Sequence, residues 1–280
     1  MLRIGLRAHD YGYLPPEQLA DALVVFKPAS IQLALAKSLP DAPAFGALSP
    51  GYARGIREIF ARRNIVIAVL GCYINPVHPD PDARDKALRR FEEHLRFARD
   101  FDCPLVGTET GSCNPDCSWH PDTQKRETFD LLCASIDRLL NTAEKCGSVV
   151  GVEAVAHQHT IASIELMAEL LERFPTPSLQ VIYDPVNLIP VTGLAEEQDR
   201  FFERAFDALG EQIAVIHAKD FCIENGKKKG SLPAGTGDLD YHALLSLVEK
   251  RKPGIDILLE NNNPRQAAAT ITLLNSLAAS

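Results

Sequence analysis

Eight short apolar segments alternate with longer mixed segments along the 280 residues of this chain. Segments rich in β-branched residues are typical of strands that are buried on both faces, as in a parallel sheet. Each of the eight precedes a segment that predicts a helix; in residues 82–100, for example, Leu88, Phe91 and Leu95 recur at helical spacing. The alternation therefore predicts parallel strands joined by helical crossovers. The predicted strands cover residues 2–8, 30–35, 65–70, 105–108, 149–155, 179–183, 213–216 and 255–259.

Eight such units, with no change of composition between them, predict a closed α/β barrel of the (β/α)8 or TIM type. We expect a single domain over residues 1–280, because this length is ordinary for one such barrel. An open doubly wound sheet would favour a glycine-rich phosphate turn after the first strand, and residues 8–12 contain none.

Composition narrows the classes of function. The net charge of −8 and the pI of about 5.5 argue against a nucleic-acid partner, which would favour a basic face. No apolar run reaches the roughly 20 residues that span a bilayer, so we expect no membrane association. The first residues run directly into a strand pattern rather than a signal peptide. Seven cysteines without regular spacing favour reduced thiols, and hence a cytoplasmic protein.

Four consecutive predicted strands each end on a residue that can bind a metal. Glu153, Asp184, His217 and Glu260 follow or close the fifth to eighth apolar segments. A charge at the end of a buried strand costs free energy unless it meets water, a partner or a metal. One such residue alone is more often a cap or half of an ion pair. Four on consecutive strands converge on one face of a barrel, because the carboxyl ends of its strands lie together.

Three carboxylates and one imidazole form a predominantly hard set of ligands. Such a set favours Mn2+ or Mg2+, with Zn2+ or Co2+ as alternatives. Three unpaired carboxylates at one barrel mouth would also repel each other, and a divalent cation removes that repulsion. The sequence therefore predicts a divalent-metal site.

Several motifs together resemble one family, the xylose isomerase-like barrels of the sugar phosphate isomerase/epimerase group. This group includes ketose 3-epimerases and hydroxypyruvate isomerases. The resemblance covers nearly the whole chain, because the order of strands agrees. The motifs that carry it are GVEAV, VIYDPVN, VIHAKD, LLEN, PAGTGDLDY at 233–241, GTETGS at 107–112 and NPVHPDP at 75–81.

The resemblance implies a metal-dependent enzyme that isomerises or epimerises a small carbohydrate. Glu153, Asp184, His217 and Glu260 would hold the metal, and the two glutamates would transfer protons as a catalytic pair. A metal that chelates a carbonyl and the adjacent hydroxyl acidifies the neighbouring C–H, so one carboxylate can remove that proton through an enediolate. A homodimer or homotetramer is ordinary for the group.

Two positions depart from the ketose epimerases of the group. Asn187 stands where they have a histidine three residues after the aspartate of the sixth strand, and Ile223 stands where they often have an arginine. These departures argue against 3-epimerisation of a free ketose. Lys219 would supply positive charge instead, because it lies two residues after His217 and thus on the same side of the strand.

Further polar residues follow strand ends and are candidates for substrate binding. Glu109 ends the fourth strand, His159 follows the fifth, and His78 lies in the loop after the third. Together with Asn187 and Lys219 they form the predicted substrate-binding set. An ion pair or a solvated histidine is an equally ordinary interpretation for these three. Trp119, the only tryptophan, would stack on a sugar face or fill an apolar gap.

Three alternative functions use the same barrel. A lyase or dehydratase acting on an inosose or keto acid would use the same enolate chemistry with loss of hydroxide. An abasic-site endonuclease would need several further histidine ligands and a surface that binds DNA. A silent barrel that binds a metabolite would have no chemical need for the four ligands.

Overall fold

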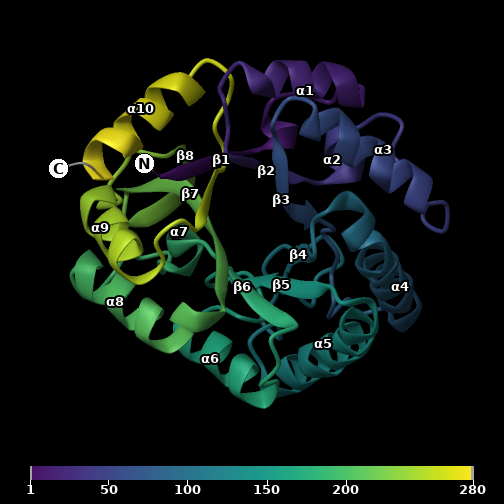
Figure 1. The fold of residues 1–280 in the computed structure, drawn as a ribbon. Coiled ribbons are helices and arrows are strands. Elements are labelled where there is room, and N and C mark those ends of the chain that lie inside the picture. The colour runs from purple at the N-terminus through teal and green to yellow at the C-terminus, as the bar shows by residue number, and fades with distance from the viewer. Residues whose placement is uncertain (1, 279–280) are drawn as a thin grey trace.

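The computed structural model describes residues 2–278, whose eight parallel strands close into a barrel that a ring of helices surrounds (Figure 1). Consecutive strands pair with each other from β1 to β7, and β9 completes the barrel by pairing with both β7 and β1. The predicted (β/α)8 fold is therefore confirmed. The barrel strands are β1 (Arg3–Arg7), β2 (Ser30–Leu33), β3 (Val66–Gly71), β4 (Leu105–Glu109), β5 (Val149–Glu153), β6 (Leu179–Tyr183), β7 (Ile213–Glu224) and β9 (Asp256–Leu259).

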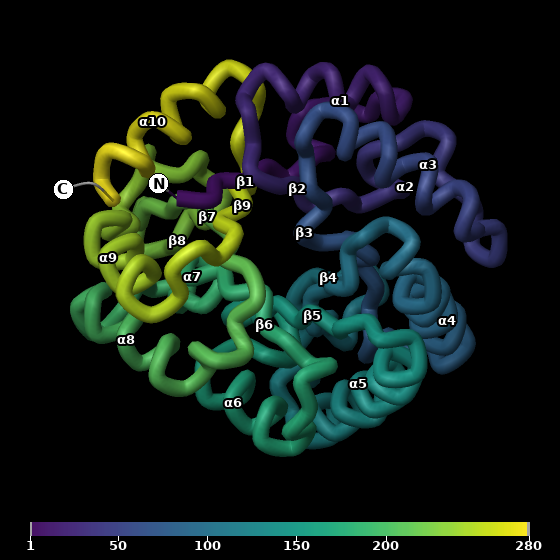
Figure 2. The backbone as a smooth tube through the Cα atoms, in the orientation of Figure 1, coloured from purple at the N-terminus to yellow at the C-terminus, as the bar shows by residue number. Residues whose placement is uncertain are grey.

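The helices follow one another once around the outside of the barrel, from purple α1 to yellow α10 in Figure 2. Their predicted order is confirmed, and most bounds shift by a few residues. Two single-turn helices, α2 and α7, were not predicted and lie in loops that leave strand ends. The helices are α1 (Pro16–Val24), α2 (Leu35–Ser38), α3 (Pro50–Ala61), α4 (Pro81–Phe97), α5 (Arg126–Cys146), α6 (Ile164–Arg173), α7 (Pro185–Leu188), α8 (Gln198–Leu209), α9 (Tyr241–Arg251) and α10 (Ala267–Ala278).

Apolar side chains fill both the layer between helices and strands and the inside of the barrel. The inner cluster consists of Val69, Leu105, Ile182, Val215 and Leu258. Gly107 lies beside it, and a Cβ atom there would come within 2.6 Å of the Ile182 side chain and 2.9 Å of Val69. A glycine at this point of β4 thus leaves room for the side chains that fill the barrel. The packed interior leaves the carboxyl ends of the strands as the place for polar groups.

The seventh strand is longer than predicted, because it continues into a hairpin outside the barrel. β7 runs to Glu224, turns through Asn225 and Gly226, and pairs with the antiparallel strand β8 (Lys227–Pro233). Both turn residues have positive φ, of 52° and 71°, which is the conformation that an Asn-Gly hairpin turn requires. The basic run at the start of β8 is part of this hairpin. Its middle member, Lys228, donates from Nζ to the carbonyl of Val186 at 2.7 Å.

The loop after β8 is held in place by Asp220, a fully buried residue of β7. Its Oδ2 accepts from the backbone N–H groups of Gly235 at 3.0 Å and Gly237 at 2.9 Å, and its Oδ1 accepts from Leu239 at 2.9 Å. A Cβ at Gly237 would lie 2.1 Å from a backbone oxygen, so glycine is needed where the loop approaches the strand. These bonds explain why the HAKD and PAGTGD motifs occur together.

We expect Asp220→Ala to lower the free energy of unfolding by about 3 kcal/mol, because it leaves several buried N–H groups without their charged acceptor. Urea denaturation of the variant checks this value. Asp238→Ala is the matched control, since Asp238 is exposed in the same loop and accepts one long hydrogen bond, of 3.4 Å. Equal loss of stability in both variants would contradict the role assigned to Asp220.

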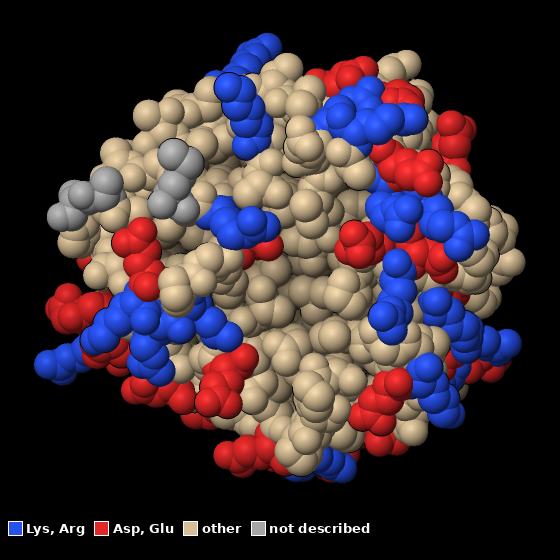
Figure 3. All heavy atoms as spheres, viewed as in Figure 1, with Lys and Arg blue, Asp and Glu red and all other residues tan. Residues whose placement is uncertain are grey.

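Charged side chains of both signs are interspersed around the rim of the face in Figure 3. No continuous field of one sign covers that face. Within residues 2–278, no helix has the length and apolar character needed to cross a membrane.

Candidate metal centre

The structure brings together Glu153, Asp184, His217 and Glu260 at the carboxyl end of the barrel. One ligand atom from each residue lies within 4.8 Å of the corresponding atoms of the other three. Glu153 is the last residue of β5, and Asp184 and Glu260 directly follow β6 and β9. His217 lies within β7. The strand ends therefore converge as the sequence predicts, although the four residues are far apart in the chain.

Local backbone geometry fixes two of these side chains. Asp184 is also the N-cap of α7, and its Oδ1 accepts from the backbone N–H of Asn187 at 3.0 Å. Its other oxygen, Oδ2, is buried and accepts no hydrogen bond of good geometry. The backbone N–H of Glu260 donates to the carbonyl of Ala218 at 3.0 Å, which continues the pairing of β9 with β7 to the site.

Lys219 carries the positive charge that lies among the carboxylates. Its Nζ is 2.9 Å from Asp184 Oδ2 and 3.1 Å from Glu260 Oε2. The side chain is buried and lies on the same side of β7 as His217, as the period-two alternation predicts. Burial works to lower the pKa of Lys219, but the charges of Asp184 and Glu260 outweigh it and raise that pKa. Lys219 is therefore a cation in the metal-free protein.

His217 is oriented by acceptors at both ring nitrogens. Its Nδ1 lies 3.2 Å from Glu153 Oε1, and its Nε2 lies 2.6 Å from the side-chain oxygen of Gln32 on β2. Burial works to lower the pKa of His217, but the charge of Glu153 and two other carboxylates outweighs it and raises the pKa to about 9. In the metal-free protein the imidazole is therefore doubly protonated. A metal would take the Nδ1 position, while Nε2–H would continue to donate to Gln32.

Arg7, the last residue of β1, contacts Oε1 of Glu260, the carboxylate oxygen that is not the one paired with Lys219. Its guanidinium forms an ion pair with Glu260 Oε1 and hydrogen bonds to Asp10 Oδ1 and Asn261 Oδ1, both at 2.8 Å. Arg7 thus links the acidic group of Glu260 to Asp10.

The two glutamates differ in their protonation. Burial raises the pKa of Glu153 to about 7. Burial also works to raise the pKa of Glu260, but the charges of Lys219 and His217 outweigh it and lower that pKa well below its usual range. Asn187 donates to Glu153 Oε1 at 2.7 Å, and Glu153 Oε2 accepts no hydrogen bond from residues 2–278. Environments that separate the pKa values of paired carboxyl groups are typical of acid–base sites.

The residues present fit a divalent cation. Three carboxylate groups and one imidazole offer hard ligand atoms within a buried space, and Asp184 Oδ2 there has room for a ligand bond beside its ion pair with Lys219. The ammonium group of Lys219 lies against the same oxygens. A cation bound by Asp184 and Glu260 would therefore displace Lys219 from these contacts.

The other predicted residues lie at different distances from this centre. Asn187 contacts Glu153, as described above. Glu109 ends β4 with a half-buried side chain, and its Oε2 lies 3.8 Å from Nδ1 of the buried His159. This nitrogen has no hydrogen-bond partner within residues 2–278. His78 lies before α4, where its Nδ1 accepts from the backbone N–H of Asp80 at 3.1 Å. No contact within residues 2–278 joins His78 to the four ligand residues.

Trp119 lies in the long loop between β4 and α5, with about half of its surface exposed. Its indole stacks on the imidazole of His157 at a centroid distance of 5.6 Å and an interplanar angle of 15°. The two rings come from loops that follow neighbouring strands, β4 and β5. This arrangement agrees with either predicted role of Trp119.

Sequence reasoning missed Arg7, Gln32 and Tyr73. Tyr73 Oη accepts from Gln32 Nε2 at 2.5 Å, so a chain of hydrogen bonds runs from the loop after β3 to His217. One signal was present: Gln32 is a lone polar residue in the apolar run SIQL, and Arg7 is a charge at the end of β1. A charge at the end of a predicted strand would have selected Arg7, and Gln32 stands out only as a polar residue within one.

Comparisons with known proteins agree with this architecture. A family model described as the xylose isomerase-like TIM barrel matches residues 29–277. No curated protein sequence matches the chain significantly. Among solved structures, a D-tagatose 3-epimerase-like protein is similar with a TM-score of 0.77 at 16% identity, over 99% of this chain and 97% of the other.

Two further structures are similar and contain metals. One is the IOLI protein with a zinc atom, with a TM-score of 0.73 at 14% identity, over 99% of this chain and 98% of the other. The second is a xylose isomerase-like TIM barrel protein from Mycobacterium smegmatis in complex with magnesium. Its TM-score is 0.71 at 15% identity, over 98% of this chain and 94% of the other. At these identities the likeness shows the fold. Together with the match over 29–277, it shows that the chain belongs to the xylose isomerase-like TIM barrel family.

Proposed function

We propose that the protein is a divalent-metal-dependent isomerase or epimerase that acts on a small keto sugar or sugar phosphate. The observation that carries the proposal is the convergence of Glu153, Asp184, His217 and Glu260 within 4.8 Å at the barrel mouth. The similarity to the D-tagatose 3-epimerase-like protein supports the same reaction class. The proposed partners are a carbohydrate and further copies of this chain, as a homodimer or homotetramer, and the proposed location is the cytoplasm.

The proposed cofactor is Mn2+ or Mg2+, with Zn2+ and Co2+ as alternatives, because three of the four ligand groups are carboxylates. The magnesium and zinc in two similar structures support a divalent ion of this kind. When bound, such an ion would polarise a substrate carbonyl and stabilise the charge that develops on it during proton abstraction. Glu153, Asp184, His217 and Glu260 would hold it.

The protein's own part is to move the proton. Arg7 forms an ion pair with Glu260, which favours its carboxylate form, and Glu260 would accept the proton from carbon. Glu153 would carry the second proton at Oε2, an oxygen that accepts no hydrogen bond from residues 2–278, and would deliver it from there. Delivery to the opposite face of the same carbon is epimerisation, and delivery to the adjacent carbon is isomerisation. The reverse reaction would exchange these roles.

The substrate would be oriented by polar groups around the metal. Lys219, once displaced from Asp184 and Glu260, would donate to a substrate oxygen that gains negative charge. Asn187 would act mainly by holding Glu153 in position. Glu109, His159 and His78 remain proposed contacts for hydroxyl groups, and Trp119 would cover one sugar face.

The test begins with protein freed of metal by a chelator and then loaded with Mn2+ or Mg2+. Exchange of carbon-bound hydrogen in D2O is followed by NMR over a panel of ketoses and sugar phosphates. We expect metal-dependent exchange, together with a new epimer or isomer as product. Loss of hydroxide instead would identify the dehydratase alternative, and exchange without metal would contradict the proposal.

Gln32 provides a prediction about metal affinity. Gln32→Met removes the acceptor of His217 Nε2 but keeps a side chain of similar length. We expect metal to bind about 10- to 100-fold more weakly, because an acceptor at the second nitrogen fixes the ring and raises its basicity. Isothermal titration with Mn2+ measures the change. Gln18→Met is the control, because Gln18 is exposed on α1, and unchanged affinity in Gln32→Met would contradict this role.

A further inference from the structure

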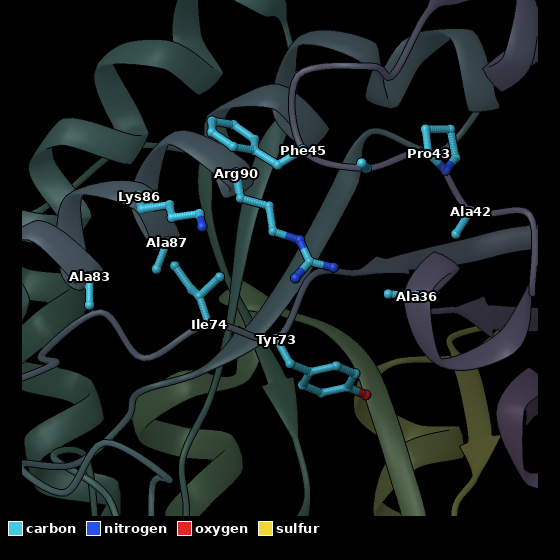
Figure 4. A pocket seen from close by; sticks show the side chains of 11 residues that line it. Ala36, Ala42, Pro43, Phe45, Tyr73, Ile74, Ala83, Lys86, Ala87 and Arg90 are labelled. Carbon is cyan, nitrogen blue, oxygen red and sulfur yellow. The ribbon is translucent and has the colours of Figure 1, made fainter.

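A cavity of about 550 Å³ lies beside the barrel mouth and has no part in the site described so far (Figure 4). The loop after β2, the loop after β3 and the first half of α4 form it, so it lies at the carboxyl end of the strands. Its volume is within the range of small-molecule sites and exceeds the space that one inorganic anion needs. The lining residues are Ala36, Ala42, Pro43, Ala44, Phe45, Tyr73, Ile74, Ala83, Lys86, Ala87 and Arg90.

A buried carboxylate fixes the outer wall of this cavity. Glu93 on α4 accepts from the backbone N–H groups of Gly46, at 3.1 Å, and Leu48, at 3.0 Å. These bonds hold the loop after β2 against α4 and place Phe45 at the edge of the cavity. The cavity is therefore a built feature with fixed walls.

The charges inside the cavity have one sign. Arg90 extends from α4 so that its guanidinium group lies between Phe45 and Tyr73, and Lys86 projects from the same helix (Figure 4). Neither side chain forms an ion pair with any residue from 2 to 278. In contrast, Arg89, the neighbour of Arg90, pairs with Asp85. A chain with a net charge of −8 thus leaves two cations of the cavity without an acidic partner.

Tyr73 connects the cavity to the metal centre. The ring of Tyr73 lines the cavity. The ammonium group of Lys37 lies over this ring, 3.8 Å from the ring centroid. Its hydroxyl group bonds to Gln32, which in turn bonds to His217. Two side chains, Tyr73 and Gln32, therefore connect the cationic cavity to His217.

We propose that this cavity binds an anionic group, phosphate or carboxylate, carried by the substrate at the end remote from the reacting carbons. Arg90 and Lys86 would pair with the anion, and the alanine, Phe45 and Ile74 side chains would contact the carbon chain that carries it. This inference rests on the proposed function, because it assigns one end of the substrate to the metal and the other end to the cavity. It favours an acidic sugar derivative over a neutral ketose.

The test is isothermal titration of the metal-loaded protein with D-fructose 6-phosphate, D-gluconate, D-fructose and inorganic phosphate. The variants are Arg90→Gln and, as the matched control on the same helix, Arg89→Gln. We expect Arg90→Gln to lower the affinity for one of the two anionic sugars at least tenfold and to leave the affinity for D-fructose unchanged. Arg89→Gln should change neither affinity. The sugar that responds identifies phosphate or carboxylate as the anion. Tighter binding of the sugar phosphate than of inorganic phosphate shows that the carbon chain also contributes.

The proposal is overturned if neither anionic sugar binds at millimolar concentration, or if Arg90→Gln binds both as the wild type does. Repeating the titration with metal-free Asp184→Asn separates this result from the proposed function. If the anionic sugar still binds to metal-free Asp184→Asn, and this binding still depends on Arg90, the cavity is an anion site even if the proposed reaction class is wrong. Metal-dependent exchange with no effect of Arg90→Gln supports the reaction and refutes the cavity.

Discussion

Glu153→Gln is expected to slow hydrogen exchange into the substrate by about 100- to 10,000-fold, the range that general acid–base groups contribute. Glutamine keeps the shape of the side chain, and its oxygen can still accept from Asn187. It cannot hold or release a proton at the Oε2 position. The variant therefore removes the proposed proton transfer itself.

The measurement is the NMR exchange rate per bound metal ion, because Glu153 is also a proposed ligand. Metal content is determined on the same sample, at saturating Mn2+. Glu249→Gln is the matched control, since Glu249 is exposed on α9 at the far side of the helix layer. Exchange within a few-fold of the wild type, in a variant that retains its metal, would show that Glu153 is a ligand and no more.

The fold was predictable because each buried strand and each amphipathic helix has its own pattern of apolar residues within a short segment of the sequence. Strands such as β6, Leu179–Tyr183, agree with the predicted range. The hairpin of β7 and β8 was missed because residues 222–233 are mostly polar and lie outside the barrel, where no buried face imposes a pattern. The turn at Asn225 and Gly226 was the signal that could have revealed it.

The convergence of Glu153, Asp184, His217 and Glu260 was predictable for a topological reason. A barrel places all strand ends on one face, so a charged residue that closes a buried strand must lie near the others. Positions in loops carry no such constraint. The sequence could not show that Asn187 holds Glu153, or that Tyr73 both lines a cavity and bonds to Gln32. These contacts depend on side-chain directions that only the folded structure fixes.

Lys219 is the residue whose role the structure changes most. The sequence suggested a substrate contact, and the structure places its ammonium group between Asp184 Oδ2 and Glu260 Oε2, two of the atoms available to a metal. The ammonium group thus contacts oxygens that the proposed ion would also use. Removal of one partner from a buried charged pair costs about 3–5 kcal/mol, because the remaining charge is left uncompensated.

Lys219→Met is therefore expected to lower the free energy of unfolding of the metal-free protein by about 3–5 kcal/mol. Saturating Mn2+ would restore most of this loss, because the ion then neutralises the same carboxylates and its binding stabilises the native state. The rise in melting temperature on adding Mn2+ should thus be larger in the variant than in the wild type. Thermal unfolding with chelator and with Mn2+ measures both values.

Lys250→Met is the control, because Lys250 is exposed on α9 and should respond to Mn2+ as the wild type does. The sign of the comparison decides between two roles of Lys219. If its ammonium group stands where the ion binds, the variant must bind Mn2+ more tightly, since no cation then has to be displaced. An equal loss of stability with and without Mn2+ would mean that ion and lysine occupy separate places, with Lys219 holding Asp184 and Glu260 in the loaded enzyme as well.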